Sequence, residues 1–159
     1  MHEMHGHSLE STKWVIQSHI AAMFLPTFFT PFLTKILGVR KLTTLGIILF
    51  SLASFVGFSD SSTIGFWIHL VLLGLGWNFL FFSATTILPQ TYAPEHKFKA
   101  QTINDTVVLS FQAFAALSAG LALNYFGWKS MIVLCVIPIF LMIIVLLWER
   151  GLKKKLSNI

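Results

Sequence analysis

The chain has 159 residues, of which 55% are hydrophobic and 11% are charged, and its mean hydropathy is +0.77. Because a soluble domain usually carries about twice this share of charged residues, the composition argues against an ordinary water-soluble domain. It also excludes intrinsic disorder, which requires low hydrophobicity and high charge density. The formal net charge of +5 would suit an anionic partner, so the positions of the charges decide what it means.

Five long segments contain no Asp, Glu, Lys or Arg: 14–34, 42–59, 61–94, 106–128 and 130–148. A helix needs about 20 predominantly apolar residues to cross the ~30 Å hydrocarbon core of a membrane. The third segment is longer, but serine, threonine and proline residues at its ends limit its apolar part to one span. The sequence therefore predicts an all-α, polytopic transmembrane helical bundle of five spans, at about 14–36, 42–58, 64–89, 102–125 and 130–148.

The connections between these spans are short, so we expect a single five-helix membrane domain over residues 13–149. Residues 1–12 would form a short extracytoplasmic tail, and residues 150–159 a basic cytoplasmic tail. Nine of the eleven Lys and Arg residues follow the first, third or fifth span, whereas Lys13 and Lys129 lie on the other side. Since cytoplasmic loops are rich in Lys and Arg, the N-terminus is expected outside and the C-terminus in the cytoplasm.

The positive charge is therefore a signal of topology. The lipid bilayer is the expected partner, and three consecutive lysines, 153–155, could contact anionic head groups. Nucleic-acid binding is not expected, because it would need a basic face interleaved with exposed aromatic residues, and the aromatic residues here lie inside the apolar segments.

Polar residues within the first span form one helical stripe that starts at His19 and continues through Met23 and three threonines, at 27, 30 and 34. Inside lipid, a polar group must find a partner or line a wet cavity. His19 could titrate near neutral pH, so His19 and Met23 are candidates for facing a solute path. Alternatively, the threonines bond to their own helix and His19 lies near the outer interface. Pro26 and Pro31 should kink or break this helix.

The third span contains Gly74 and Gly76, followed by Trp77 and Asn78. Small residues allow helices to approach closely, so packing is the expected role of the glycines. Trp77 and Asn78, in the middle of the span, are candidates for contact with a solute.

In the fourth span, Asp105 and Gln112 lie on one helix face. Gln112 is a further path candidate. Asp105 is an acid at the edge of an apolar core, so it could act as a cytoplasmic gate or a proton-linked carboxylate. The alternative role of Asp105 is to complement the dipole of the first helical turn. The small residues Ala116 and Gly120 favour helix packing.

Enzymatic residue sets are not found. His2, His5 and His7 lie in the short N-terminal segment, and the sequence has no Ser/His/Asp or Cys/His set, no phosphate-binding glycine loop and no paired carboxylates within the spans. We therefore expect no catalytic residue, no metal site and no cofactor.

The segment 31–41 resembles the signature loop of the major facilitator superfamily, G-x-L-x-D-R-x-G-R-[RK]-[RK]. Leu33, Gly38, Arg40 and Lys41 match it, whereas Pro31, Lys35, Ile36 and Val39 depart from it. A weakened copy is typical of the loop between the eighth and ninth helices of the family. Gly38, Arg40 and Lys41 would then help the cytoplasmic ends of the helices to dock and separate.

Five further segments resemble a bacterial branch of these transporters: 5–8, 15–19, 23–30, 73–80 and 100–105. The resemblance implies helices eight to twelve of a twelve-helix carrier, in the bacterial inner membrane, working by alternating access with a solute cavity between two halves. The chain would then lack the seventh helix and the N-terminal half, and we expect it not to transport alone. The coupling ion stays open, because the third span has no Arg; His19 or Asp105 could couple protons. The substrate is a small molecule whose class the sequence does not identify.

The alternative is a self-contained five-span membrane protein that forms oligomers or serves as a subunit.

Overall fold

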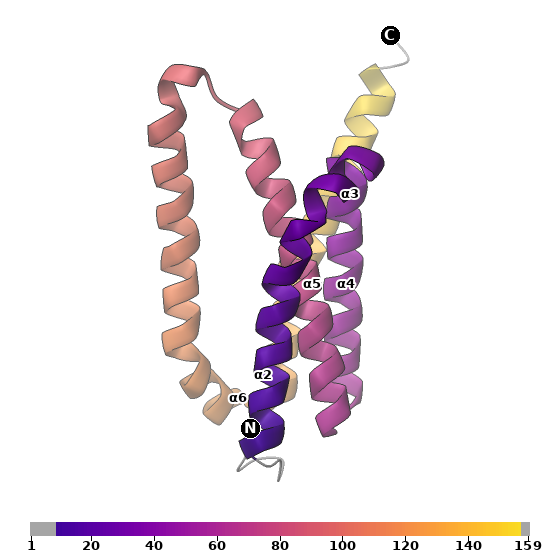
Figure 1. Cartoon of the computed structure of the whole chain (residues 1–159), viewed down its shortest axis with the longest axis vertical. Helices are drawn as coiled ribbons and strands as arrows, with labels where there is room; N and C mark the ends of the chain where they lie inside the picture. The colour runs from indigo at the N-terminus through magenta and orange to yellow at the C-terminus, as the bar shows by residue number, and fades with distance from the viewer. Residues whose placement is uncertain (1–8, 157–159) are drawn as a thin grey trace.

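The structure is a computed structural model that describes residues 9–156, and every regular element in this range is a helix (Figure 1). The elements, in chain order, are α2 (Leu9–Phe24), η1 (Leu25–Phe28), α3 (Thr30–Leu37), α4 (Val39–Ser59), α5 (Thr63–Ile87), η2 (Leu88–Gln90), η3 (Pro94–His96) and α6 (Lys97–Leu156). The predicted all-α fold is confirmed for these residues. His2, His5, His7 and the segment 5–8 lie outside them.

The first predicted span is broken, as its two prolines indicated. Helix α2 passes into the short 3-10 helix η1, which contains Pro26, and the chain then bends by 58° into α3. Pro26 has no N–H to donate to the preceding turn, so the regular hydrogen-bond ladder stops there. Pro31 lies at the start of α3, where a missing N–H costs little.

Helices α4 and α5 pack closely through glycines. A Cβ atom added to Gly46 would lie 3.2 Å from the carbonyl oxygen of Gly76, and one added to Gly76 would lie 3.0 Å from the carbonyl oxygen of Gly46. On another side of α5, a Cβ atom on Gly74 would lie 2.8 Å from the carbonyl oxygen of His19 in α2. The packing role predicted for Gly74 and Gly76 is confirmed.

Short turns connect these helices. Gly38 has φ = 79°, a left-handed conformation that favours glycine, and it separates α3 from α4. Between α4 and α5, the Asp60 carboxylate accepts a hydrogen bond of 2.8 Å from the backbone N–H of Ser62. This bond and a second one from the Ser62 side chain lower the pKa of Asp60.

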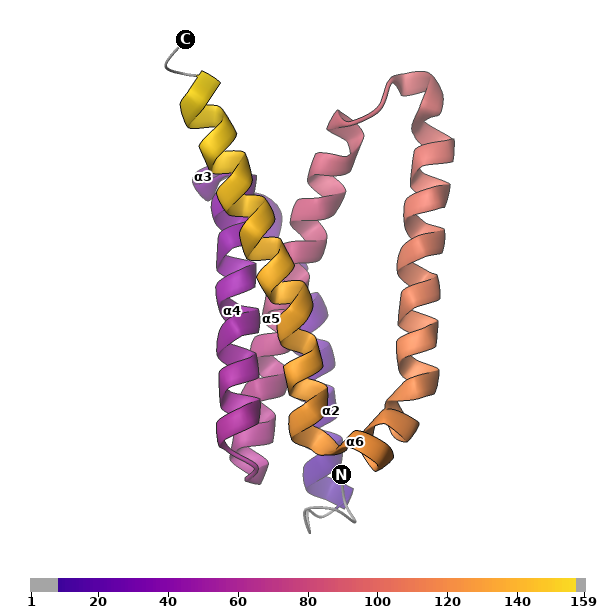
Figure 2. The same ribbon diagram turned by 180° about the vertical axis from the view of Figure 1, so that it is seen from behind.

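Helix α6 is divided at Gly127, whose φ of 72° and ψ of 170° are not helical. Figures 1 and 2 show that the two parts run in opposite directions and lie apart. We call residues 97–126 the first arm and residues 128–156 the second arm. Both lie within a helix of 60 residues, whereas the sequence predicted two separate spans, at about 102–125 and 130–148.

The second arm packs against α4 and α5. Trp128 donates a hydrogen bond of 2.8 Å from Nε1 to the carbonyl oxygen of Gly57 in α4. Its ring meets those of Phe66 and His69 in α5 edge-on, at centroid distances of 4.8 Å and 5.5 Å. His69 Nδ1 lies 2.7 Å from the carbonyl oxygen of Ala53. This cluster joins three helices at the end of the molecule where α4 meets α5.

The first arm has far fewer neighbours. Phe98, Phe111, Phe114 and Leu117 are all at least 72% exposed. A Cβ atom added to Gly120 would have no other atom within 4 Å. The packing predicted for Ala116 and Gly120 therefore has no partner among residues 9–156, and a long apolar face of this arm lies open.

Three helices in the described residues are long and apolar enough to cross a membrane: Val39–Ser59, Thr63–Gln90 and Pro94–Gly151. The bent pair Glu10–Phe28 and Thr30–Leu37 makes a fourth if it is taken as one span. This number is lower than the five predicted, because the predicted fourth and fifth spans lie in one helix that only Gly127 interrupts.

Candidate solute pocket

A pocket of about 330 Å³ lies where α2, α5 and the first arm of α6 come together. Its volume is near the lower end of the range for small-molecule sites. Three of the predicted path residues, Met23, Trp77 and Gln112, line it together with Asp105. The remaining lining residues are Phe24, Phe81, Asn104, Val108 and Leu109.

Aromatic rings form one wall of the pocket. Trp77 and Phe81 are one helical turn apart in α5, and their rings stack with a centroid distance of 4.8 Å and an interplanar angle of 8°. Phe24 from α2 meets Trp77 edge-on, with a centroid distance of 6.1 Å. Both arrangements are those that aromatic rings prefer. The wall therefore consists of the parallel rings of Trp77 and Phe81, with the ring of Phe24 packed edge-on against Trp77.

Polar side chains of α6 form the opposite wall. Asn104 donates a hydrogen bond of 3.1 Å from Nδ2 to Oδ1 of Asp105, and Gln112 lies two turns further along the helix. Within residues 10–151, the Asp105 carboxylate has no ion-pair partner, although the sequence places Lys97 and Lys99 near it. The pocket thus combines an apolar ring face with an uncompensated acid and two amides.

Asn78 lies beside this pocket but points into the broken first span. Its Nδ2 donates to the carbonyl oxygen of Met23 at 2.7 Å and to Oγ1 of Thr27 at 2.8 Å. Its Oδ1 lies 2.8 Å from Oγ1 of Thr30, whose single proton is shared with the carbonyl oxygen of Pro26. Asn78 is only 3% exposed. It holds the break between α2 and α3 against α5.

His19 also bonds to α5 and does not line the pocket. Its Nδ1 lies 2.6 Å from the carbonyl oxygen of Leu70, so this nitrogen carries the proton and donates. The alternative that the threonines of the first span bond to their own helix applies to Thr34, which donates a hydrogen bond of 2.7 Å to the carbonyl oxygen of Thr30. The places of His19 and Asn78 in a solute path stay predictions.

Two other cavities, of about 340 and 360 Å³, lie between α4 and the second arm of α6. Their walls are mostly aliphatic and aromatic. The polar lining residues are Ser51 and Thr44, which bond to their own helix, Ser54, and Arg150, which donates a hydrogen bond of 3.5 Å to Oγ1 of Thr44.

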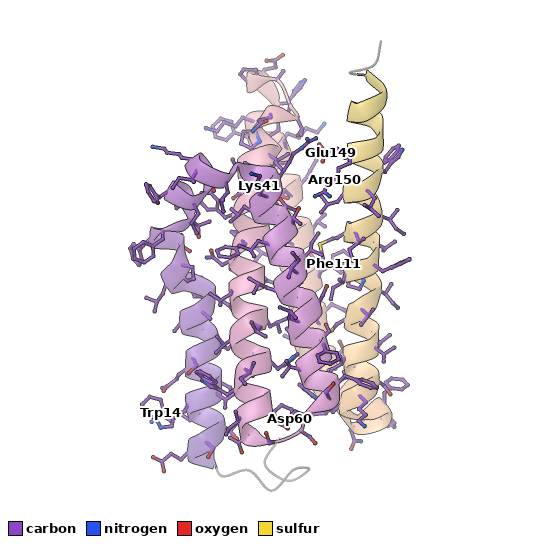
Figure 3. The ribbon with its side chains drawn as sticks, turned by 90° about the vertical axis from the view of Figure 1, so that its right-hand side faces the viewer. Trp14, Lys41, Asp60, Phe111, Glu149 and Arg150 are labelled. Carbon is purple, nitrogen blue, oxygen red and sulfur yellow. The ribbon has the colours of Figure 1, made fainter. Side chains whose placement is uncertain are left out.

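At the opposite end from Trp14 and Asp60, charged residues of α4 and α6 meet, and Figure 3 shows Lys41 near Glu149 and Arg150. Arg40 forms an ion pair with Glu149. This contact joins the signature-like loop to the second arm of α6. The docking role predicted for Gly38, Arg40 and Lys41 stays a prediction.

We expect the Arg40→Glu variant to lower the free energy of unfolding by less than about 1 kcal/mol, because both side chains are almost half exposed and exposed pairs contribute little. Adding Glu149→Arg should restore the ion pair and the stability. Thermal unfolding in detergent, followed by circular dichroism, measures both changes. A swap that stays as unstable as the single variant would contradict a direct interaction.

Sequence reasoning missed Phe24 and Phe81 as pocket residues. A signal for Phe81 was present, because its spacing of four from Trp77 places the two rings on one helix face. Phe24 follows Met23 directly at the end of α2, and its contact with Trp77 of α5 depends on how these two helices pair.

Comparison of the sequence with known protein families agrees with this architecture. The sequence profile of the Major Facilitator Superfamily matches residues 1–158. The chain belongs to this superfamily. The family, with the apolar helices, makes the chain an integral membrane protein and points to a transporter rather than an enzyme.

Curated members of the Major Facilitator Superfamily align with most of the chain. The riboflavin transporter RfnT of Brucella anthropi is 36% identical over 126 residues, which are 79% of this chain and 32% of the relative. The uncharacterized transporter YdeG of Bacillus subtilis is 33% identical over 150 residues, which are 92% of this chain and 35% of the relative. The chain thus spans about a third of these relatives. No solved structure matches it.

Proposed function

We propose that the chain forms helices eight to twelve of a Major Facilitator Superfamily transporter, which moves a small solute by alternating access. The observation that carries the proposal is the pocket between α2, α5 and α6, which has an aromatic wall and a polar wall beside an apolar arm left uncovered. In carriers of this kind, the solute site lies near the midplane, between two repeated halves. The pocket would be one side of such a site.

The five spans belong to this proposal. Each arm of α6 on either side of Gly127 is about 45 Å long at ~1.5 Å per residue, enough to cross the ~30 Å hydrocarbon core. Together with α4, α5 and the bent pair of α2 and α3, the two arms give five crossings. The tail at 1–12, the membrane domain at 13–149 and the basic tail at 150–159 follow from this division.

We expect reporter fusions at residue 61 to be active outside the cytoplasm and fusions at residue 97 to be active inside it. The reason is the excess of Lys and Arg at the end of the bundle that includes Lys41 and Arg150 (Figure 3). Paired phosphatase and fluorescent-protein fusions in a bacterial inner membrane measure this. The reverse pattern would contradict the orientation, and two reporters on the same side would contradict the single span, α5, between residues 61 and 97.

The partner in this proposal is the rest of a twelve-helix carrier, which would cover the first arm of α6. Self-association of a five-span protein is the competing possibility, because it would cover the same face.

Coupling to protons would run through His19 or Asp105. The test replaces both His19 and Asp105 in a functional carrier and measures transport as a function of pH. If the pH dependence of transport is unchanged, this part of the proposal is overturned.

Riboflavin, which is named as the solute of one relative, is the first candidate substrate. The chain is expressed in a bacterial strain that requires external riboflavin and lacks its own carrier, either alone or with the N-terminal two thirds of the Brucella anthropi relative. We expect labelled riboflavin to be taken up only by cells that contain both parts, and the two parts to co-purify.

Uptake by the chain alone would overturn the incomplete-carrier proposal in favour of self-assembly. A pair that co-purifies but takes up no riboflavin would overturn riboflavin as the substrate. Parts that do not co-purify would count against the shared twelve-helix architecture.

A further inference from the structure

The pocket described above has a shape that favours flat molecules. The parallel rings of Trp77 and Phe81 form a short stack, and 44% of Phe81 is exposed. A planar aromatic solute would extend this stack in the offset arrangement that rings prefer. An aliphatic acid would leave the ring faces without a matching surface.

The opposite wall has a defined polarity. A carboxylate can only accept hydrogen bonds, and Asp105 has one oxygen, Oδ1, that already accepts from Asn104. Among residues 10–151, no ion pair neutralises it. An acid in this position attracts N–H donors and cations and repels anions. Asn104 and Gln112 add amide groups, which both donate and accept.

We infer that the pocket selects planar aromatic solutes that carry an N–H donor on the ring edge and no negative charge nearby, and that the Asp105 carboxylate accepts the hydrogen bond from that donor. This inference rests on the proposed function, since it names the chemistry of the same site. It gives Asp105 a role in solute recognition, which differs from the roles of a cytoplasmic gate and of a contact with the helix dipole.

The test measures binding to the purified full chain in lipid nanodiscs. Three planar probes are used: lumiflavin, which has a ring N–H; 3-methyl-lumiflavin, in which a methyl group replaces that hydrogen; and proflavine, a cation with amino groups on its ring. Dissociation constants come from equilibrium dialysis. Because the chain has five tryptophans, the part of the tryptophan quenching that is lost in the Trp77→Phe variant reports contact with Trp77.

We expect lumiflavin to bind about tenfold more tightly than its methylated form, because a hydrogen bond to a charged group is lost. Replacing Asp105 by alanine should remove this preference, so that the two flavins bind equally. Replacing Asp105 by asparagine, which keeps a neutral acceptor, should weaken proflavine more than lumiflavin. Tryptophan quenching by each probe that binds should fall in the Trp77→Phe variant, because phenylalanine keeps a ring stacked on Phe81 but removes the fluorescent indole.

The matched controls are Glu95→Gln, which removes an acid outside the pocket, and Phe111→Leu, which removes an exposed ring from the same helix arm. Both should bind the probes as the original chain does. Circular dichroism of each variant shows whether its helices are retained.

The outcomes separate this inference from the riboflavin proposal. If lumiflavin binds with the expected preference while the co-purified pair of parts takes up no riboflavin, the inference stands and riboflavin is overturned as the substrate. If proflavine binds and depends on Asp105 while neither flavin binds, Asp105 attracts cations alone and the inference is overturned. If both flavins bind equally to the original chain, or if folded Asp105 variants bind all probes unchanged, the inference is overturned, whatever the uptake experiment gives. If no planar probe binds to the folded chain, the inference is also overturned.

Discussion

Replacing Gly74 by alanine should lower the free energy of unfolding by about 2 kcal/mol, in the range expected for overpacking. The added Cβ atom would lie 2.8 Å from the carbonyl oxygen of His19 and 2.9 Å from the Cβ atom of Ala22. The first atom belongs to the backbone of α2 and the second to an alanine, so neither can rotate away. Helices α2 and α5 must therefore separate. Separation would also stretch the hydrogen bonds of His19 and Asn78 between α2 and α5.

Gly120→Ala is the matched control for this variant. The same methyl group would meet no atom within 4 Å, and alanine in a helix is favoured over glycine by about 0.5–1 kcal/mol. The two substitutions should therefore change stability in opposite directions. Thermal unfolding in detergent, followed by circular dichroism, measures both, and an equal loss in the two variants would contradict the close approach of α2 and α5 at Gly74.

Replacing Asn78 by leucine should cost about 2 kcal/mol, because a buried amide that bonds three groups is lost and its partners stay buried. The carbonyl oxygen of Met23 and the hydroxyl groups of Thr27 and Thr30 would lose their bonds from α5. The consequence should be local, since these bonds hold the bent first span. Hydrogen exchange should increase most strongly in residues 23–30.

The control for Asn78 is the same substitution at Asn124, which is exposed near the end of the first arm. Asn124→Leu should leave both the unfolding temperature and the exchange of residues 23–30 unchanged. If Asn78→Leu behaves like this control, the amide does not hold the break, and the bend would have to depend on the prolines alone.

The sequence was sufficient to predict the all-α fold, because charge-free segments leave few alternatives to helices in lipid. It also predicted the break at Pro26 and Pro31, whose physical cause is local. The division of α6 was predicted less well, because Phe126, Trp128 and Lys129, which lie between the predicted spans, are helical and Gly127 alone departs from helical geometry.

The candidate pocket was predicted in part. Met23, Trp77 and Gln112 share it, as polar or bulky residues of separate spans were expected to do. Asn78 could not be assigned in the same way, because its partners lie 48 to 55 residues earlier in the chain. Which face of α5 meets α2 and which meets α6 depends on how distant helices pair, and no local pattern contains that information.

The joint at Gly127 gives the first arm of α6 a mechanical consequence. The arm is a stiff rod that is attached at Gly127 and, at its other end, at the non-helical residues 91–93. Asp105 lies 22 residues from Gly127, a lever of about 33 Å at ~1.5 Å per residue. A rotation of only ~5° at the joint, accommodated at its other end by residues 91–93, would move Asp105 by about 3 Å, roughly the length of one hydrogen bond. Small torsional changes at a single glycine would thus be converted into opening or closing of the pocket wall.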